Sequence, residues 1–482
     1  MLFVGLRNRI GKAFGYDAAE STAARKAPAV RQVSEDTELN QAKRGKVNAV
    51  SIDLKRNFAT VGWGIRKHLD YVSRFRFQAR TGNSQLDDQL EKLVKIQSRA
   101  ENCDAAGRHS LDKMLRLVEQ MAILTGDCGL LKLRDGRLQG IEGERIRDTT
   151  GGSTSQDEPF QWIQGIRVNR AGKSVAYALH KRTGSSFGLE RNVPAANMIW
   201  HGYYDRFDQV RGISPITSAL NSFQDCYEAS DYALQKMKVN QFFTMVMKLK
   251  DNNEAPGTED DSEDAANPVV SFGKYGPRQL IMKEGDEVST LESAQPSNQF
   301  QDYTRFTISV ALKALDIPYS FFDESFTNFY GSRAAAIQYV RSCKDKVENL
   351  RGVLRKITDW WFQLWILDGH LVLPEGMTID DLNYEWIQEG MPWWDPEKEI
   401  NAAIMSVNAG FNSPQRVCRE NGTGDFFEMI DETKEAFEYA AKNGVPLIYG
   451  MSTMPVTAQP PANQTNPDET ANKELRAWYG KD

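Results

Sequence analysis

Few residues in this sequence are spaced for chemistry, and the clearest group is a lysine-containing loop. The segment NRAGKS at residues 169–174 resembles the end of a phosphate-binding loop, in which backbone amides and a lysine hold phosphate groups. The full motif needs glycine at position 167, where Arg167 stands, and the surrounding pattern does not predict strand, loop and helix in that order. A nucleotide site is therefore not expected here.

Metal-binding and nucleophilic groups are scattered. The chain has five histidines, and neither an HExxH motif nor a close cluster of cysteine and histidine occurs, which argues against a metalloenzyme. An odd number of widely separated cysteines fits a reducing compartment rather than a disulfide framework; they are Cys103, Cys128, Cys226, Cys343 and Cys418. The sequence predicts no catalytic residue, no metal ligand and no cofactor.

A strongly acidic segment interrupts the middle of the chain. Residues 251–266 contain seven acidic side chains and no basic one. The run Glu259–Asp264 could bind divalent cations, but a solvated loop is the simpler interpretation, because such a segment buries too little apolar surface to order itself. It separates two strand-like runs, so a small β subdomain with a disordered tip is expected.

Overall charge limits the partners that the protein can have. The 482 residues carry a formal net charge of −6 at pH 7, whereas proteins that hold nucleic acid tightly are usually basic. Any contact with DNA should therefore be local or loose, and broad attraction to anionic membranes is not expected. Since neither a signal peptide nor a run of roughly 20 apolar residues occurs, the sequence predicts a soluble intracellular protein.

The first half of the chain is predicted to be mixed α+β. Apolar residues at helical spacing predict an amphipathic helix at 109–126, and alternating apolar and basic residues predict a half-exposed strand at 71–80. The glycines of VGWG at 61–64 are expected to end the apolar stretch that follows Asn57. Further strands are expected at residues 127–146, 165–168, 175–180 and 198–201.

Longer helices are predicted in the second half. Ser214 and Pro215 suit the N-cap and first residue of a helix at 214–241, and another helix is expected at 298–315. The longest regular pattern predicts a helix at 332–367 with one apolar stripe. The stripe contains Val340, Cys343, Val347, Leu350, Leu354, Ile357, Trp361 and Leu364. Core within the subunit is its simpler interpretation, and a subunit interface is the alternative.

Short helices with clear starts are predicted after residue 390. Asp395, Ser413 and Asp425 are expected N-caps, the first two followed by proline and the third with capping-box spacing to an acidic residue. Gly410 and Gly444 suit helix stops. These signals predict a small helical unit near the end of the chain.

Four segments in this order resemble a known family. They are RNFATVGWGIRKHLD at 56–70, RGISPITSAL at 211–220, FTNFYGSRAAAIQYVR at 326–341, and the segment at 392–436 that begins PWWDPEKE. Each motif alone is weak, but together, in a chain of this length, they resemble the lambda-like portal proteins of tailed bacteriophages. The resemblance covers about residues 46–447.

The resemblance implies an α+β, portal-type fold with a mixed α+β wing, a helical stem, a small β clip subdomain and a helical crown. It implies a dodecameric ring at one capsid vertex, the channel through which double-stranded DNA is packaged and ejected. The implied divisions are a flexible arm (1–45), wing (46–210), stem helix (211–245), clip (246–297), second stem helix (298–317), tunnel loop (318–331), long helix and wing (332–394), crown (395–447) and disordered tail (448–482).

The resemblance also implies partners and a location. The partners would be further copies of the chain, the terminase large subunit, a head–tail connector protein, the major capsid or scaffolding protein, and DNA passing through without sequence specificity. No membrane partner is implied. The protein would lie in the virion at the portal vertex, and in the host cytoplasm during assembly.

The implied tunnel loop gives the candidate DNA-facing residues. A channel in which DNA slides should not grip it, because tight phosphate contacts would have to be broken at every step. The residues expected to line the constriction are Asn328, Phe329, Tyr330 and Arg333, and those that could face phosphates are Arg305, Lys313, Arg341 and Lys344. Ordinary solvated helix charges, or packing under the next helix for the aromatic residues, remain the alternatives.

Two other classes of protein stay open at this point. An enzyme of DNA metabolism, such as a nuclease or a protease fused to an assembly module, would require a metal or nucleophile site. Another ring-shaped virion component, such as a head–tail connector or tail protein, would generally be shorter and would show fivefold or sixfold symmetry.

Overall fold

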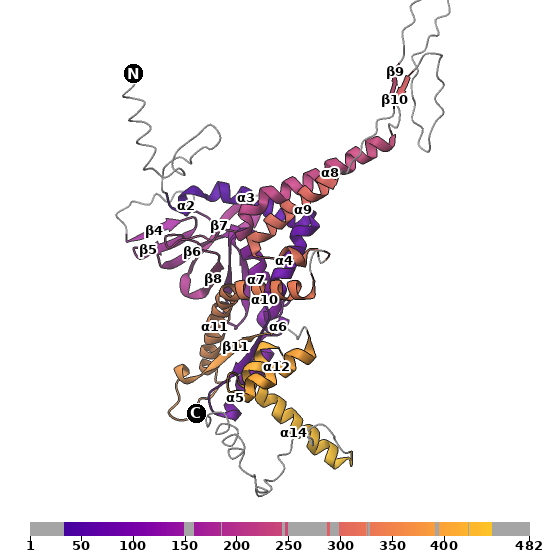
Figure 1. Cartoon of the computed structure of the whole chain (residues 1–482). Helices are drawn as coiled ribbons and strands as arrows, with labels where there is room; N and C mark the ends of the chain where they lie inside the picture. Colours follow the sequence, from indigo (N-terminus) through magenta and orange to yellow (C-terminus); the bar gives the residue numbers. More distant parts are fainter. Residues whose placement is uncertain are drawn as a thin grey trace, which may run out of the picture. The chain divides into compact units, whose positions relative to one another are not determined.

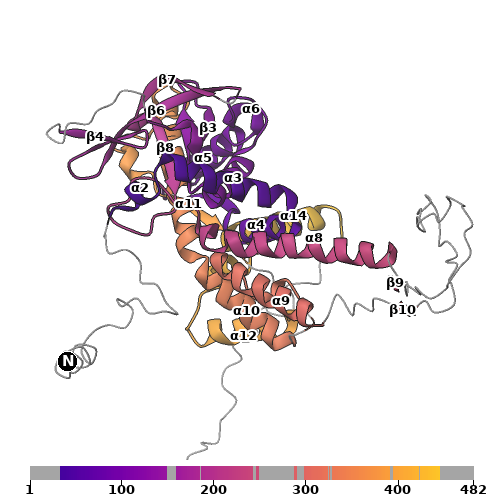
Figure 2. The same cartoon turned by 90° about the horizontal axis from the view of Figure 1, so that it is seen from above.

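A computed structural model describes residues 33–148, 159–184, 186–242, 246–248, 287–289, 298–323, 325, 328–390, 395–422 and 424–445 (Figures 1 and 2). In these residues helices are combined with small antiparallel sheets, which confirms the α+β class. The chain divides into two compact units, residues 1–388 and 389–482. None of the described helices is long and apolar enough to cross a bilayer.

Three helices begin the described part of the chain: α2 (Glu35–Glu38), α3 (Gln41–Asn57) and α4 (Ala59–Val72). The arm boundary expected at residue 45 is too late, because the buried side chains of Asp36 and Arg44 already bond to distant residues of the first unit. The stop expected at VGWG is wrong, since α4 runs through both glycines. Gly64 serves close packing instead: a Cβ there would lie 3.5 Å from Leu312 Cδ2.

Small antiparallel sheets lie within the first unit. One sheet has the order β3–β2–β8, a second β4–β5–β6–β7, and a third pairs β1 with β11. Their bounds are β1 (Phe75–Ala79), β2 (Asp127–Lys132), β3 (Leu138–Glu142), β4 (Phe160–Ile163), β5 (Ile166–Asn169), β6 (Ser174–Thr183), β7 (Ser186–Pro194), β8 (Met198–Gly202) and β11 (Tyr384–Gln388). The predicted strands are confirmed, although the first begins only at Phe75 because Tyr71 belongs to α4.

Helices pack on these sheets to form the main core. They include α5 (Ser84–Gln97), α6 (Ala100–Cys103) and α7 (Leu111–Thr125). The helix predicted at 109–126 is confirmed as α7, and the Ser110 hydroxyl caps it by accepting the Lys113 N–H. Its apolar face, with Met114, Leu115 and Val118 buried, belongs to one core cluster with residues of α4, β2 and α11.

Two long helices lie side by side in both views: α8 (Leu220–Phe242) and α9 (Asn298–Leu312). Ser214 does not cap a helix as expected. Its hydroxyl donates to the Ile123 carbonyl oxygen at 2.6 Å, and Pro215–Ala219 form a 3-10 turn, η4, before α8 begins. Along α8, Phe223 is buried, whereas Leu234 is 44% exposed.

A short antiparallel pair is described between these two helices: β9 (Val246–Lys248) and β10 (Glu287–Ser289). The acidic loop expected at 251–266 lies outside the described residues, as do residues 1–32 of the expected arm and the expected tail at 448–482. After α9, Lys313–Leu315 form the 3-10 turn η5, so the helix predicted at 298–315 is confirmed.

The predicted long helix is two helices, which are α10 (Phe329–Ser342) and α11 (Lys344–Leu367). The break falls at Cys343, within the apolar stripe, and Val347 to Trp361 continue that stripe as buried core. Trp361 is fully buried, and its indole N–H donates to the Gly136 carbonyl oxygen at 2.9 Å. The stripe is therefore core of the first unit.

The second unit contains three described helices: α12 (Pro396–Asn408), α13 (Pro414–Glu420) and α14 (Phe426–Lys442). Ser413 and Asp425 cap α13 and α14 as predicted, by accepting the backbone N–H of Arg416 and Phe427. The Asp395 side chain does not cap α12 and accepts from Lys398 Nζ at 2.8 Å instead. The expected stops, Gly410 and Gly444, have the positive φ that suits glycine.

Candidate nucleic-acid interface

The segment between α9 and α10 is held at its first half by aromatic packing. Tyr319–Phe321 form the 3-10 turn η6. The ring of Phe321 stacks on Tyr71 of α4 at 5.8 Å and meets Tyr339 of α10 edge-on at 5.4 Å. Phe322 meets Trp63 of α4 edge-on at 5.8 Å. These contacts hold the first half of the segment against α4 and α10.

The candidate constriction residues surround the start of α10. Asn328 is its N-cap, with the side-chain oxygen accepting the Gly331 N–H at 2.8 Å. Tyr330 is 72% exposed, and Arg333 is half-buried. The side chain of Phe329 lies outside the described residues. An exposed tyrosine on a capped helix start could touch a polymer that passes this end of α10.

The candidate phosphate-facing residues do not form one cluster. Arg305 of α9 lies 3.9 Å from the carboxylate of Asp323, so part of its charge is balanced. Lys313 is exposed at the end of α9. Arg341 and Lys344 are exposed and follow Tyr330 at helical spacing. The structure thus gives α10 and the start of α11 an outward face that carries an aromatic ring and several cations.

The outward face of α9 is apolar. Tyr303, Phe306 and Val310 are 59%, 66% and 49% exposed, and their spacing places them on one stripe. The opposite side of α9 buries Ile308 and Ala311. A helix that is apolar on both sides needs a second covering surface.

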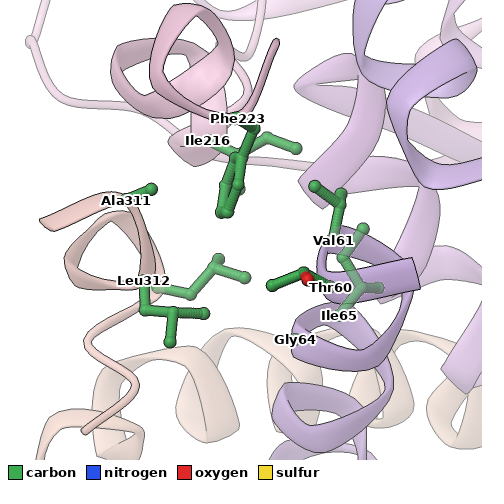
Figure 3. Close-up of a pocket in the computed structure, with 9 residues that line it drawn as sticks. Thr60, Val61, Gly64, Ile65, Ile216, Phe223, Ala311 and Leu312 are labelled. Carbon is green, nitrogen blue, oxygen red and sulfur yellow. The ribbon is translucent and has the colours of Figure 1, made fainter. Parts of the chain in front are cut away.

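A small apolar cavity lies where α4 meets the start of α8 and the end of α9 (Figure 3). Phe223 from α8, Ala311 and Leu312 from α9, and Val61 and Ile65 from α4 point toward it. Among the residues that line the cavity, Thr60 is the only one with a polar side chain. Apolar packing therefore joins the helix pair to the rest of the unit.

A buried polar network lies beneath the aromatic contacts. Tyr339 Oη and His68 Nδ1 are 2.9 Å apart. His68 Nε2 lies 3.5 Å from one carboxylate oxygen of Glu119, and His201 Nε2 lies 3.0 Å from the other. The Tyr203 hydroxyl also donates to Glu119. The network connects α4, α7, β8 and α10, and the sequence patterns did not indicate it.

Two members of this network have pKa values away from their ordinary ranges. Burial opposes the charge of Glu119, but hydrogen bonds from His201 and His68 outweigh it and lower the pKa of Glu119 to about 2. Burial lowers the pKa of His68 below its ordinary value, and Glu119 only partly offsets this. Glu119 is therefore held as a carboxylate, and His68 resists protonation.

Acidification is expected to destabilise the first unit through both groups. Below its ordinary pKa of 6.5, His68 binds a proton in the unfolded chain but less readily in the folded one, and Glu119 behaves in the same way between 4.5 and about 2. Since the unfolded state binds more protons, stability falls as pH falls. The thermal midpoint should drop between about pH 7.5 and 5.5, and His68→Gln should remove much of that drop. Equal slopes for both proteins would contradict this assignment.

A second buried network holds the RGISP segment. All five guanidinium N–H groups of Arg211 donate: two to the carboxylate of Asp127 at 2.7 and 2.8 Å, and three to backbone carbonyl oxygens. Arg211 N–H itself donates to Asp36 at 3.0 Å. Arg44 donates to Gln164 at 2.9 Å and to the Gly212 carbonyl oxygen. This network fastens α2 and α3 to the sheets.

The two loop motifs that could suggest chemistry are hairpin turns. NRAGKS is the turn between β5 and β6, where Asn169 Oδ1 accepts the N–H groups of Ala171 and Lys173. The segment Gly184–Gly188 has the GxSxG pattern of a nucleophile turn. Its serine at the nucleophile position, Ser186, is the first residue of β7, which pairs with β6, whereas a nucleophile elbow joins a strand to a helix. Within the described residues, no cluster that could hold a metal ion occurs.

Comparison with known proteins gives consistent results. The family model described as "Phage portal protein, lambda family" matches residues 22–346. The probable portal protein of Halomonas phage phiHAP-1 is 21% identical to this chain, and the alignment covers 93% of this chain and 95% of that protein.

Solved structures with a similar chain come from gene transfer agent particles. A chain from the neck of the empty particle is 11% identical with a TM-score of 0.47, over 82% of this chain and 94% of that one. A chain from the neck of the native particle is 12% identical with a TM-score of 0.44, over 78% and 94%.

Proposed function

Because the chain belongs to the lambda family of phage portal proteins, we propose that its copies form a dodecameric ring at one capsid vertex and enclose the channel for packaging and ejection of double-stranded DNA. The family match over residues 22–346 carries the proposal. A portal is a structural component rather than a catalyst, and the scattered chemical groups of this sequence agree with that role.

In this role the ring has several partners. The terminase large subunit docks on it during packaging, and a head–tail connector protein binds it afterwards, while the major capsid or scaffolding protein surrounds it. The protein then belongs to the virion, after assembly in the host cytoplasm.

The described elements suggest how the chain contributes to the ring. We assign the sheets and α4–α7 to a wing, α8 and α9 to a stem, β9 and β10 to a clip, and α12–α14 to a crown. The apolar outward stripe of α9, formed by Tyr303, Phe306 and Val310, supports assembly. A closed ring uses contacts between two different faces of each copy, and such a contact would cover the stripe.

Electron microscopy of the purified full chain, with native mass measurement, tests the ring. We expect end-on views of a ring of twelve copies around an open channel, since that is the proposed assembly. A stable monomer or dimer at high concentration would contradict the proposal. Sixfold or fivefold rings would favour another connector of the virion instead.

The proposed tunnel loop has its own test. Deleting residues 324–331 removes the candidate constriction residues Asn328, Phe329 and Tyr330 and keeps the turn η6 with its aromatic contacts. We expect rings to form normally and DNA packaging or retention to fall. Infectious yield and packaged DNA measure the effect in a phage that carries the variant. Normal yield from the variant would refute the assignment of 318–331 as the constriction.

A further inference from the structure

A cleft in the first unit collects positive charge from three separate elements. It has a volume of about 380 Å3, within the size range of small-ligand clefts, roughly 300–1,000 Å3. Lys132 of β2, Lys173 of the β5–β6 turn and Lys356 of α11 line it.

The lysines of the cleft are not neutralised within the described residues. Neither Lys173 nor Lys356 has an ion-pair partner there, and both are exposed. Lys132 is half-buried, with its ammonium group 5.7 Å from the centre of the Trp360 ring. Burial and then the positive charge of Lys356 lower the pKa of Lys132, because both disfavour its protonated form. Asp359 partly opposes this effect.

The floor of the cleft is aromatic and apolar. Tyr177 and Trp200 lie with ring centres 5.1 Å apart, and Met198 and Ile199 also line the cleft. Tyr204 lies beside Trp200 in the lining of the cleft. The cleft thus combines cations with an apolar floor.

This combination selects among anionic ligands. Duplex DNA is too wide to enter a cleft of this volume and presents no apolar group to its floor. A free phosphate would meet the cations but leave the floor uncovered. A peptide with carboxylates and large apolar side chains satisfies both parts, because its charges meet lysines at the rim while its apolar side chains displace water from the floor.

We propose that the cleft lined by Lys132, Lys173 and Lys356 is a docking site for an acidic, apolar segment of a partner protein. The site lies within the first unit and does not depend on the channel or on the stem helices. Its existence therefore goes beyond the role of a DNA conduit.

Fluorescence anisotropy on the assembled full chain tests this docking site. The probe is a fluorescein-labelled peptide of alternating glutamate and leucine, and the same peptide with glutamine in place of glutamate is its control. We expect saturable, salt-sensitive binding of the glutamate peptide only. Lys173→Glu with Lys356→Glu should weaken binding roughly tenfold, because two favourable charge pairs become repulsive.

The matched control is Lys92→Glu with Lys95→Glu, two exposed lysines of α5, which should leave binding unchanged. Equal binding by the cleft variant and the control would overturn the proposal. Displacement of the peptide by duplex DNA that binds with the same lysine dependence would also overturn it, in favour of a nucleic-acid site. If inorganic phosphate at millimolar concentration displaces the labelled peptide as well as unlabelled peptide does, the cleft is a general anion site. That outcome would also overturn the proposal. Ring formation is scored separately in each sample, so failure of the ring and failure of the cleft are distinguishable.

Discussion

Replacing Arg211 by alanine is expected to lower the free energy of unfolding of the first unit by roughly 3–5 kcal/mol, because removing one partner of a buried ion pair leaves the other charge without compensation. Asp127 would keep only the Gly212 N–H, at 2.8 Å, of the donors that now hold its carboxylate. Three backbone carbonyl oxygens would lose their donor as well. Guanidinium denaturation followed by tryptophan fluorescence measures the loss.

Two companion variants separate the network from charge alone. Arg211→Lys keeps the charge but not the planar fork of donors, and we expect it to recover only a minor part of the stability. Arg206→Ala removes an exposed arginine that pairs with Glu35 at 3.3 Å, and its cost should stay below about 1 kcal/mol. If Arg211→Ala has the same free energy of unfolding as the wild type, the buried network contributes nothing to stability.

Replacing Trp361 by alanine is the second large effect that we expect. The side chain is fully buried in the core of the first unit, stacked on Trp365 at 6.1 Å. Alanine would leave a cavity of nearly the whole indole, and the Gly136 carbonyl oxygen would keep only the bond from Gln97 Nε2 at 3.2 Å. Large-to-small changes of this kind cost roughly 3–5 kcal/mol, which the same denaturation experiment measures.

The neighbouring tryptophan is the matched control. Trp360 is half-buried beside Lys132, so Trp360→Ala should cost much less than Trp361→Ala. A similar loss of stability in both variants would indicate that Trp361 is not more buried than Trp360. A loss below about 1 kcal/mol for Trp361→Ala would contradict full burial.

The regular elements of this protein were largely predictable, because burial imposes a period on the sequence. The apolar residues of α7 recur at helical spacing, and those of α11 do so from Val347 to Trp361. The break at Cys343 was not predictable in this way. The stripe passes through it without a change of period, and neither proline nor glycine marks it.

The glycines of VGWG misled the prediction for a different physical reason. A glycine can end a helix, or it can admit a neighbour at close range inside one. Gly64 does the second, with Leu312 and Ile317 packed over the site of its missing Cβ. Only knowledge of the distant helix α9 distinguishes the two roles.

The buried polar networks left no periodic signal. Glu119 lies on the core face of α7 among apolar residues, and its partners come from elements far along the chain. Arg211 stands just before a recognisable Gly-x-Ser-Pro motif, but Asp127, which pairs with it, is far away in sequence. Spacing along the chain cannot pair such residues. The candidate DNA-facing residues came from family resemblance, and their role stays a prediction.

The apolar outward stripe of α9 has a consequence for the newly made chain. While Tyr303, Phe306 and Val310 stay uncovered, each free copy exposes an apolar surface that can bind other proteins non-specifically in the crowded cell. Correct assembly and random aggregation then compete for the same surface, and both accelerate as copies accumulate. The window for productive assembly is therefore set by the rate of synthesis as much as by affinity. Slow expression should yield more soluble material than rapid expression of the same total amount.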